Sequence, residues 1–322
     1  MYKDKKVIGI DVSKDKIDVY KAGVSKVYSN DQQGFKLFKK ELLCEYSHCV
    51  MEVTGAYHQL LAMYLHQKGV EVSVINPLIV KRFIQMQLHH NKTDKSDAKQ
   101  IASFGEQQTL NLWTPPAKHV TQCKLIYACI NQYNKQSTAL KNKLHSLASQ
   151  GIQTGALVRS VKRQVAHLKT EKNKLEEELE KLINKHDAEL YTNLKSVPGL
   201  GKKTALLLIV SLDGFRDFEN YRQVCAYLGL SPVEHSSGSS VRGRTRISKR
   251  GNPLMRNYLF MCSFTACEHN EQCKALYERI VNKGKSKKLA LIAVSNKLIR
   301  QAFGIAKSGI PYDPMYKSKL SA

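Results

Sequence analysis

The sequence has few acidic residues, no long apolar run and no cysteine pair at metal-binding spacing. Asp and Glu number 27 of 322 residues against 51 Lys and Arg, a formal net charge of +24. Such an excess indicates a polyanionic partner such as DNA or RNA, although not which sequence it binds. No run approaches the roughly 18 apolar residues of a membrane-spanning helix. We therefore expect no membrane partner and, since the first residues lead into a strand pattern, no signal peptide.

The eight cysteines include no Cys-x-x-Cys pair and lack nearby histidines that would complete a zinc site. We interpret them as reduced, mostly buried thiols, which fits a cytoplasmic protein. An apolar content of 42% and a charged content of 24% are ordinary for a soluble globular chain. The length allows two or three domains.

Short apolar segments alternate with amphipathic ones up to about residue 107. Three expected strands are followed by helix, strand, helix and strand, which indicates a mixed sheet with helices packed against it. This order suits a ribonuclease-H-like fold, although an actin-like ATPase domain begins similarly. The expected strands are residues 7–12, 17–20, 26–29, 49–52 and 70–75, and the expected helices are 35–43 and 58–67.

Four carboxylates stand where such a sheet would gather them. Asp11 and Glu52 each end an apolar run, so both are expected to project from the carboxyl ends of buried strands. Asp94 and Asp97 lie three residues apart at an expected helix start, where they share one face. Gathered together they would repel one another, and a hard divalent cation with oxygen ligands would relieve that repulsion. The pattern indicates a metal held against phosphate.

Beyond residue 116 the pattern changes to long helices with few turn signals. Six apolar residues follow the alternation of a heptad seam, which Lys172 interrupts, and they predict a coiled-coil arm. The preceding helix could fold back along it across Gln150 and Gly151, or the pair could serve a second protomer; the sequence permits both. The seam residues are Val161, Val165, Leu168, Leu175, Leu179 and Leu182.

A glycine-bearing turn with Gly199 and Gly201 leads through Lys202 into an apolar helix at residues 205–212. Such a turn can present backbone amides to a phosphate at a helix amino end. It resembles the hairpin of helix-hairpin-helix DNA-binding motifs, and a plain interhelical turn is the alternative. Its spacing does not match a nucleotide P-loop.

Residues 235–252 are rich in serine, glycine and arginine, and no acid occurs between Glu234 and Glu268. A solvated, flexible charge run is one interpretation. However, the stretch lies between apolar helical segments. Closely spaced arginines can hold phosphate oxygens and stabilise charge in phosphoryl transfer, and a hydroxyl among them could be a nucleophile. The expected nucleic-acid contacts here are Arg242, Arg244, Arg246, Lys249 and Arg250.

Five short motifs occur along the chain. They are GIDVSK at 9–14, MEVTG at 51–55, KTDKSDA at 92–98, VPGLG at 197–201, and SSG at 236–238 followed by ISKRGN at 247–252. Their combination and order resemble the DEDD-type insertion-sequence transposases related to the Piv invertases. The resemblance extends through essentially the whole chain.

The resemblance implies a RuvC-like domain in which Asp11, Glu52, Asp94 and Asp97 coordinate magnesium, as one or two ions. It also implies a transposase domain whose serine attacks DNA covalently. The residue before the motif glycine is Ser237, with Ser236 as the alternative. It further implies a homo-oligomer, a dimer or tetramer, in which the acids of one subunit complete a site with the serine of another. A structured bridge RNA would pair with target and donor DNA.

The sequence thus predicts an α/β RuvC-like domain at 1–112, a helical coiled-coil arm at 113–192 and a mainly α-helical transposase domain at 193–322. The predicted function is a recombinase that cuts and rejoins DNA through a phosphoserine intermediate. One alternative is a RuvC-like nuclease in which metal-activated water cuts DNA without a protein adduct. The other is a non-catalytic nucleic-acid-binding scaffold, which unchanged recombination after Asp11→Ala would support.

Overall fold

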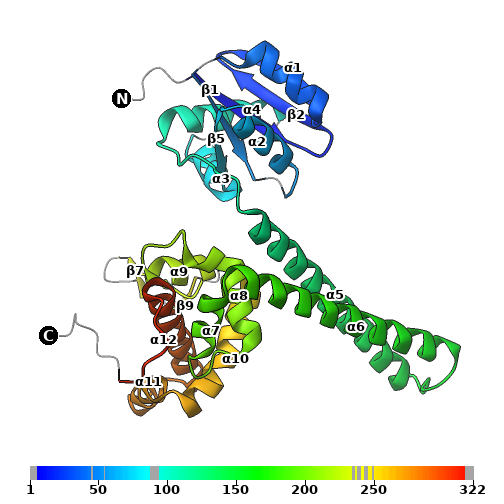
Figure 1. The fold of residues 1–322 in the computed structure, drawn as a ribbon, viewed down its shortest axis with the longest axis vertical. Helices are drawn as coiled ribbons and strands as arrows, with labels where there is room; N and C mark the ends of the chain where they lie inside the picture. Colours follow the sequence, from blue (N-terminus) through cyan, green and yellow to red (C-terminus); the bar gives the residue numbers. More distant parts are fainter. Residues whose placement is uncertain are drawn as a thin grey trace. The chain divides into compact units, whose positions relative to one another are not determined.

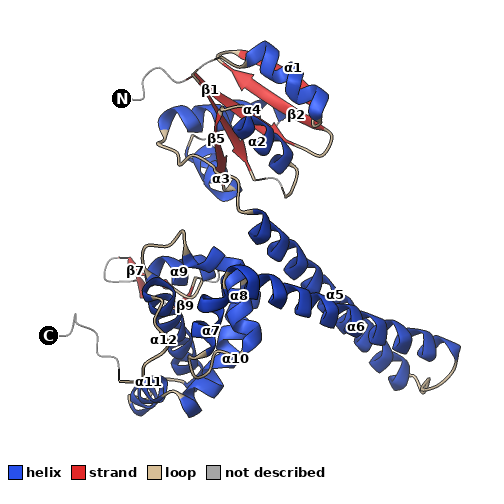
Figure 2. Ribbon diagram, viewed as in Figure 1, coloured by secondary structure: helices blue, strands red, loops and turns tan. Residues whose placement is uncertain are grey.

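The chain forms two compact units, which are described separately: Met1–Pro116 and Ala117–Ala322 (Figure 1). The computed structural model describes residues 6–44, 46–53, 55–87, 94–233, 236–237, 241–242, 246–248 and 250–315. In these ranges the first unit combines strands with helices, whereas the second is mainly helical (Figure 2).

A five-stranded sheet in the order β3-β2-β1-β4-β5 forms the centre of the first unit. β1 pairs antiparallel with β2, and β2 with β3, whereas β1, β4 and β5 run parallel. The mixed sheet expected from the sequence is confirmed, and the expected strands match the observed ones to within two residues. The strands are β1 (Lys6–Val12), β2 (Lys16–Lys21), β3 (Val24–Ser29), β4 (Ser47–Glu52) and β5 (Glu71–Ile75).

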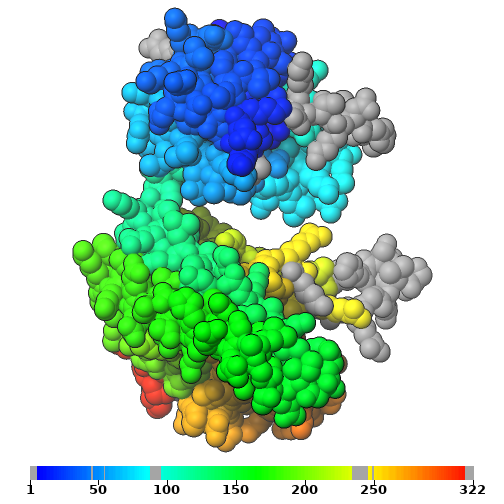
Figure 3. Space-filling view, turned by 90° about the vertical axis from the view of Figure 1, so that its right-hand side faces the viewer, coloured from blue at the N-terminus to red at the C-terminus, as the bar shows by residue number. Residues whose placement is uncertain are grey.

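Two pairs of helices cover the two faces of this sheet. α1 (Gln32–Leu42) and α2 (His58–Gln67) pack on the face that carries Ile8, Ile10 and Val12. α3 (Pro77–Met86) and α4 (Asp94–Gln107) pack with Val7, Val50 and Ile75 on the opposite face. The two faces follow from the alternation of side chains along a strand. In the space-filling view the unit is one packed body, coloured blue to cyan (Figure 3).

The long helices α5 (Lys118–Ser149) and α6 (Ala156–His186) pack against each other within one chain (Figure 1). Of the two arrangements left open by the sequence, the fold-back is the one observed. All six seam residues are buried or half-buried, because this stripe of α6 faces α5. The base of the pair, including Cys123, Ile126 and Leu179, joins the core of the second unit.

Six further α-helices lie in the described part of the second unit. They are α7 (Ala188–Lys195), α8 (Lys202–Leu212), α9 (Tyr221–Leu228), α10 (Pro253–His269), α11 (Glu271–Asn282) and α12 (Lys287–Ser308). By length and composition α12 could cross a membrane, with a mean hydropathy of 1.2. However, Val294, Leu298, Ile299 and Ala302 are fully buried against neighbouring helices. α12 is therefore a helix of the second unit's hydrophobic core.

Four two-residue strands lie between α9 and α10, in and beside the serine-, glycine- and arginine-rich stretch at 235–252. β6 (Pro232–Val233) pairs with β9 (Arg246–Ile247), and β7 (Ser236–Ser237) pairs with β8 (Val241–Arg242). Both pairings are antiparallel and join the same two chain segments. We call this paired region the serine hairpin. Strands this short carry too few residues for a detectable alternation.

Candidate active site

Asp11 and Glu52 lie side by side on neighbouring strands. β1 and β4 are parallel, with Ile10 opposite Met51, so the next residues of the two strands reach the same level. Neighbouring strands are about 4.8 Å apart. Both acids are half-buried. Since Glu52 lies two residues past Val50, side-chain alternation places it on the face covered by α3 and α4.

Helix α4 packs closely against β1 because Gly9 has no side chain. A Cβ at Gly9 would lie 2.1 Å from the carbonyl oxygen of Ala98. Further along the helix, a Cβ at Gly105 would lie 2.8 Å from the Val7 side chain. The helix therefore runs antiparallel to β1, with its amino end toward Asp11. Asp11 shares the face of Gly9, two residues away, and hence faces α4.

The start of α4 reaches the same level of the sheet as the strand acids. Asp11 is two residues past Gly9, about 7 Å along the strand. Asp94 is the first residue of α4 and four before Ala98, about 6 Å along the helix. Asp97 is adjacent to Ala98 and half-buried. The helix start predicted at Asp94 is observed, and the packing of α4 on Gly9 brings it to the ends of β1 and β4.

The donor set at this face suits a hard divalent cation, because it consists of carboxylate oxygens from three separate elements. We call Asp11, Glu52 and Asp97 the acidic face. The side chain of Asp94 lies outside the described residues. Among the described His, Cys, Asp and Glu side chains, no three already lie close enough together to hold a metal. The described carboxylates share one face of the sheet and lie at the same level along the strands. Asp94 would be a fourth ligand.

Asp18 is an acid of this region that the sequence reasoning missed. It lies opposite Asp11 in the β1–β2 register and is 5% exposed. Residues directly opposite on antiparallel strands place their side chains on the same face. Its carboxylate is 3.1 Å from the Lys16 ammonium group. The sequence pattern could have indicated this position. Ile17 and Val19 are apolar, so side-chain alternation puts Asp18 on the other face of the sheet, with Asp11.

The serine hairpin places the backbones of both candidate serines in β7, with Ser236 opposite Arg242 and Ser237 opposite Val241. The side chains of these serines and of Arg242 lie outside the described residues, as do Arg244 and Lys249 entirely. Arg246 and Arg250 are described and exposed.

The base of the serine hairpin is anchored to α9. A Cβ at Gly251, which has a φ of +129°, would lie 2.2 Å from the Tyr227 carbonyl oxygen. Arg256 donates a hydrogen bond of 3.0 Å to the Leu228 carbonyl at the end of α9. The chain leaving the hairpin is therefore held tightly against this helix.

The turn at Gly199 has a packing role. With a φ of +104°, Gly199 adopts a conformation that favours glycine, and a Cβ there would lie 2.6 Å from the Ala266 Cβ of α10. Gly201 caps α8 in open space, without a side-chain hydrogen bond to the first turn. The turn thus lets α8 begin close to α10, while the backbone at Gly201 stays exposed.

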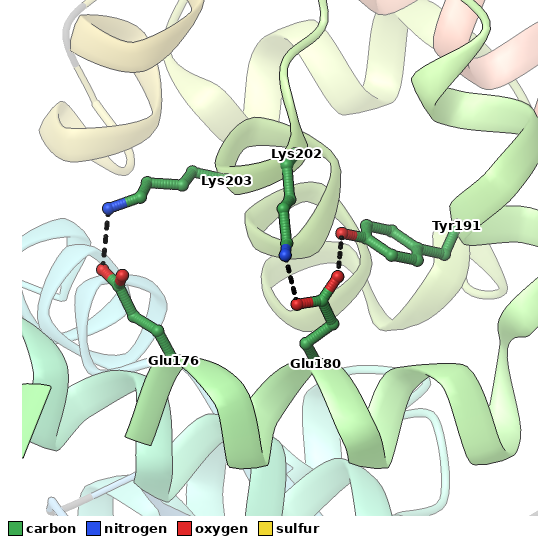
Figure 4. A network of polar contacts seen from close by, with 5 residues as sticks. All are labelled: Glu176, Glu180, Tyr191, Lys202 and Lys203. Atoms are coloured by element: carbon green, nitrogen blue, oxygen red, sulfur yellow. Dashed lines mark hydrogen bonds and ion pairs between the residues drawn. The ribbon is translucent and has the colours of Figure 1, made fainter. Parts of the chain in front are cut away.

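Lys202, for which a nucleic-acid contact stays a prediction, forms an ion pair with Glu180 of α6 (Figure 4). The Tyr191 hydroxyl donates to the same carboxylate at 3.0 Å, and Lys203 lies 3.0 Å from Glu176. The hydrogen bond from Lys202 lowers the pKa of Glu180. Burial, followed by this carboxylate, raises the pKa of Tyr191. We call the two lysine–glutamate pairs the arm latch.

Acids gathered on a mixed sheet, joined to a basic helical unit, are features of a DNA transposase, and family comparisons assign the chain to that class. A transposase family of the DEDD type matches residues 8–152. A second family model, described as "Transposase IS116/IS110/IS902 family", matches residues 191–278. The two matches fall in both units and identify the chain as an insertion-sequence transposase, an enzyme that cuts and rejoins DNA.

Similar proteins extend across both units. The pilin gene-inverting protein of Moraxella bovis is 26% identical over 325 residues, covering 96% of this chain and 98% of the relative. The transposase for insertion sequence element IS1111A of Coxiella burnetii is 24% identical, covering 92% and 88%. The transposase for insertion sequence element IS1328 of Yersinia enterocolitica is 24% identical, covering 94% and 97%. The resemblance to insertion-sequence transposases that the sequence motifs indicated is confirmed.

Proposed function

We propose that this transposase cuts and rejoins DNA through a covalent phosphoserine intermediate formed by Ser237. The observation that carries the proposal is the packing of α4 on Gly9, which brings Asp97 to the level of Asp11 and Glu52. Carboxylate oxygens from three elements that share one face and one level are the ligand type that a hard divalent cation such as Mg²⁺ prefers.

Asp11, Glu52, Asp94 and Asp97 would hold magnesium, as one or two ions. When bound, Mg²⁺ offsets the charge that develops on the phosphate oxygens during phosphoryl transfer. Cutting is therefore confined to the phosphate that the cation-loaded acids hold.

Ser237 would supply the nucleophile. Its hydroxyl oxygen bonds to the phosphorus, and the bond from phosphorus to the leaving deoxyribose oxygen breaks. The serine proton leaves to solvent or a nearby base, and the released oxygen takes up a proton. Rejoining is the same exchange with a DNA hydroxyl as nucleophile and Ser237 as leaving group. The phosphoester bond count is unchanged, so no nucleotide cofactor is required.

Guidance and assembly are inferred from the family resemblance of the sequence motifs. We infer a structured bridge RNA that pairs with donor and target DNA, and a homo-oligomer in which the acids of one subunit act with the serine of another. The net charge of +24 supports a large nucleic-acid partner. The fold-back of α5 on α6 leaves their exposed faces available to a second protomer. We place the protein in the cytoplasm.

The test is the covalent adduct. Wild-type protein, incubated with its element DNA, co-purified RNA and Mg²⁺, should yield cleaved DNA that migrates with the protein after denaturation. Ser237→Ala should abolish the adduct, and Ser236→Ala should retain it. Reversal of the two results would assign the nucleophile to Ser236. Free 5′-phosphate ends without any adduct would instead establish the hydrolytic nuclease.

A further inference from the structure

A groove lined by three cations lies between α9, α11 and α12, and none of its residues belongs to the candidate active site. Gln272, Leu276 and Arg279 recur on α11 at spacings of four and three residues, and Lys297 and Arg300 face them from α12. These spacings put each set on one side of its helix. The cavity between them has a volume of about 450 Å³, within the range of ligand pockets.

The cavity continues into a second hollow along α12. This hollow has a volume of about 730 Å³ and shares Tyr221, Gln272, Lys297 and Arg300 with the first. We call the two together the basic groove. Its extension along a helix, beyond the size of a single small ion, suits a chain-like ligand better than a compact one.

The positive charges of the basic groove are not neutralised by any ion pair among the described residues. Among the described residues, no ion pair involves Arg279, Lys297 or Arg300. Asp313 is the one described carboxylate that lines either hollow. Arg300 lies 5.4 Å from the centre of the Tyr221 ring.

The pKa of Lys297 reflects the positive charge around it. Burial lowers its pKa, and the neighbouring charges of Arg300 and then Arg279 lower it further. Lys297 is half-buried between the two exposed arginines, so its charge is held at a cost that a bound anion would offset. Arginine in particular suits phosphate, because its planar guanidinium donates two parallel hydrogen bonds.

We propose that the basic groove binds the sugar-phosphate backbone of a nucleic acid through Arg279, Lys297 and Arg300. The proposal rests on the proposed function, which supplies nucleic acid as the partner, and adds a contact surface separate from the predicted contacts at residues 199–202 and 242–250. The phosphodiester could come from DNA or from guide RNA, and free inorganic phosphate shares its chemistry.

The test compares full-length proteins that have lost equal charge. One variant carries Arg279→Gln, Lys297→Gln and Arg300→Gln. The control carries Lys274→Gln, Lys283→Gln and Lys285→Gln, three exposed lysines in and just after α11. Affinities for duplex DNA, single-stranded DNA and RNA of one sequence are measured by fluorescence anisotropy across salt concentrations. A third variant, Arg279→Lys, Lys297→Arg and Arg300→Lys, keeps the charge.

We expect the groove variant to lose affinity for at least one nucleic acid, on the order of a hundredfold at 0.1 M salt, and its salt slope to fall by about 3. The charge-keeping variant should retain the slope. The nucleic acid most affected identifies the source of the phosphodiester. Equal losses in the groove variant and the lysine control, or no loss in either, would overturn the proposal.

Two further measurements distinguish nucleic-acid binding in the groove from free-anion binding and from the proposed covalent chemistry. Thermal unfolding in inorganic phosphate, against chloride at equal ionic strength, tests free anion binding. Stabilisation that the groove variant alone loses, with unchanged oligonucleotide affinity, would make this a small-anion site and overturn the nucleic-acid proposal. Ser237→Ala should abolish the covalent adduct but leave groove binding intact, so failure of the proposed function is distinguishable from failure of the groove.

Discussion

At the scale of single residues, two glycines set the geometry of the acidic face. Gly9 admits the backbone of α4, and Gly105 fits between Val7 and Val50. The acids themselves were predictable, because each ends an apolar run or opens a helix. The contact that unites them was not, since an expected helix start at Asp94 and Asp97 carries no signal for which strand the helix packs on. Asp18 was missed because strand alternation was applied to apolar residues alone.

Gly9→Ala tests this contact. The added Cβ would meet backbone rather than a movable side chain, so α4 must shift from β1, and we expect a loss of about 2 kcal/mol or more in the free energy of unfolding. Denaturant unfolding measures it. Gly304→Ala is the matched control, because Gly304 lies within a helix in open space. There alanine should stabilise by about 1 kcal/mol. Equal stability of Gly9→Ala and wild type would refute the close packing.

At the scale of elements, the helical arm shows what a heptad seam determines. The seam fixed which face of α6 is buried, and all six predicted residues lie on it. It did not fix the partner, because a helix of the same chain and a helix of a second protomer satisfy the same apolar stripe. The serine hairpin shows the opposite limit, since its two-residue strands lie below the length at which a pattern can be detected.

The arm latch gives a prediction at this scale. Glu176→Gln with Glu180→Gln would release Lys202 and Lys203 at the start of α8. Because both lysines are exposed and a glutamine oxygen can still accept from Tyr191, we expect less than about 1 kcal/mol of lost stability. Duplex affinity should rise about fivefold at 0.1 M salt, as two lysines become available to phosphate.

The control for the arm latch is Glu177→Gln with Glu178→Gln, two exposed positions on the same helix. It removes the same charge without releasing a lysine from a described ion pair, so its affinity should rise less than about twofold. Anisotropy titrations of both variants with duplex DNA would compare the two rises in affinity. Equal rises would show that only net charge matters, and that Lys202 makes no phosphate contact when released.

At the scale of the whole molecule, the candidate sites are divided between the two units. The acidic face lies in Met1–Pro116, whereas the serine hairpin, the arm latch and the basic groove lie in Ala117–Ala322. Composition predicted a nucleic-acid partner from net charge, and the family match agrees with it. Composition could not separate the roles of individual cations, because these roles depend on which cations form ion pairs. Lys202 is paired with Glu180, whereas Arg279 and Lys297 have no described acidic partner.

The central claim is that the strand acids and the acids at the start of α4 form one cation site. Mn²⁺ binding to the full-length protein, followed by electron paramagnetic resonance, tests it most directly. Asp11→Asn and Asp97→Asn should each weaken binding by at least about tenfold. Asp15→Asn, in the exposed turn after β1, should leave it unchanged. Wild-type Mn²⁺ affinity in Asp97→Asn, with binding lost in Asp11→Asn, would show that the helix start takes no part in the site and would contradict the account.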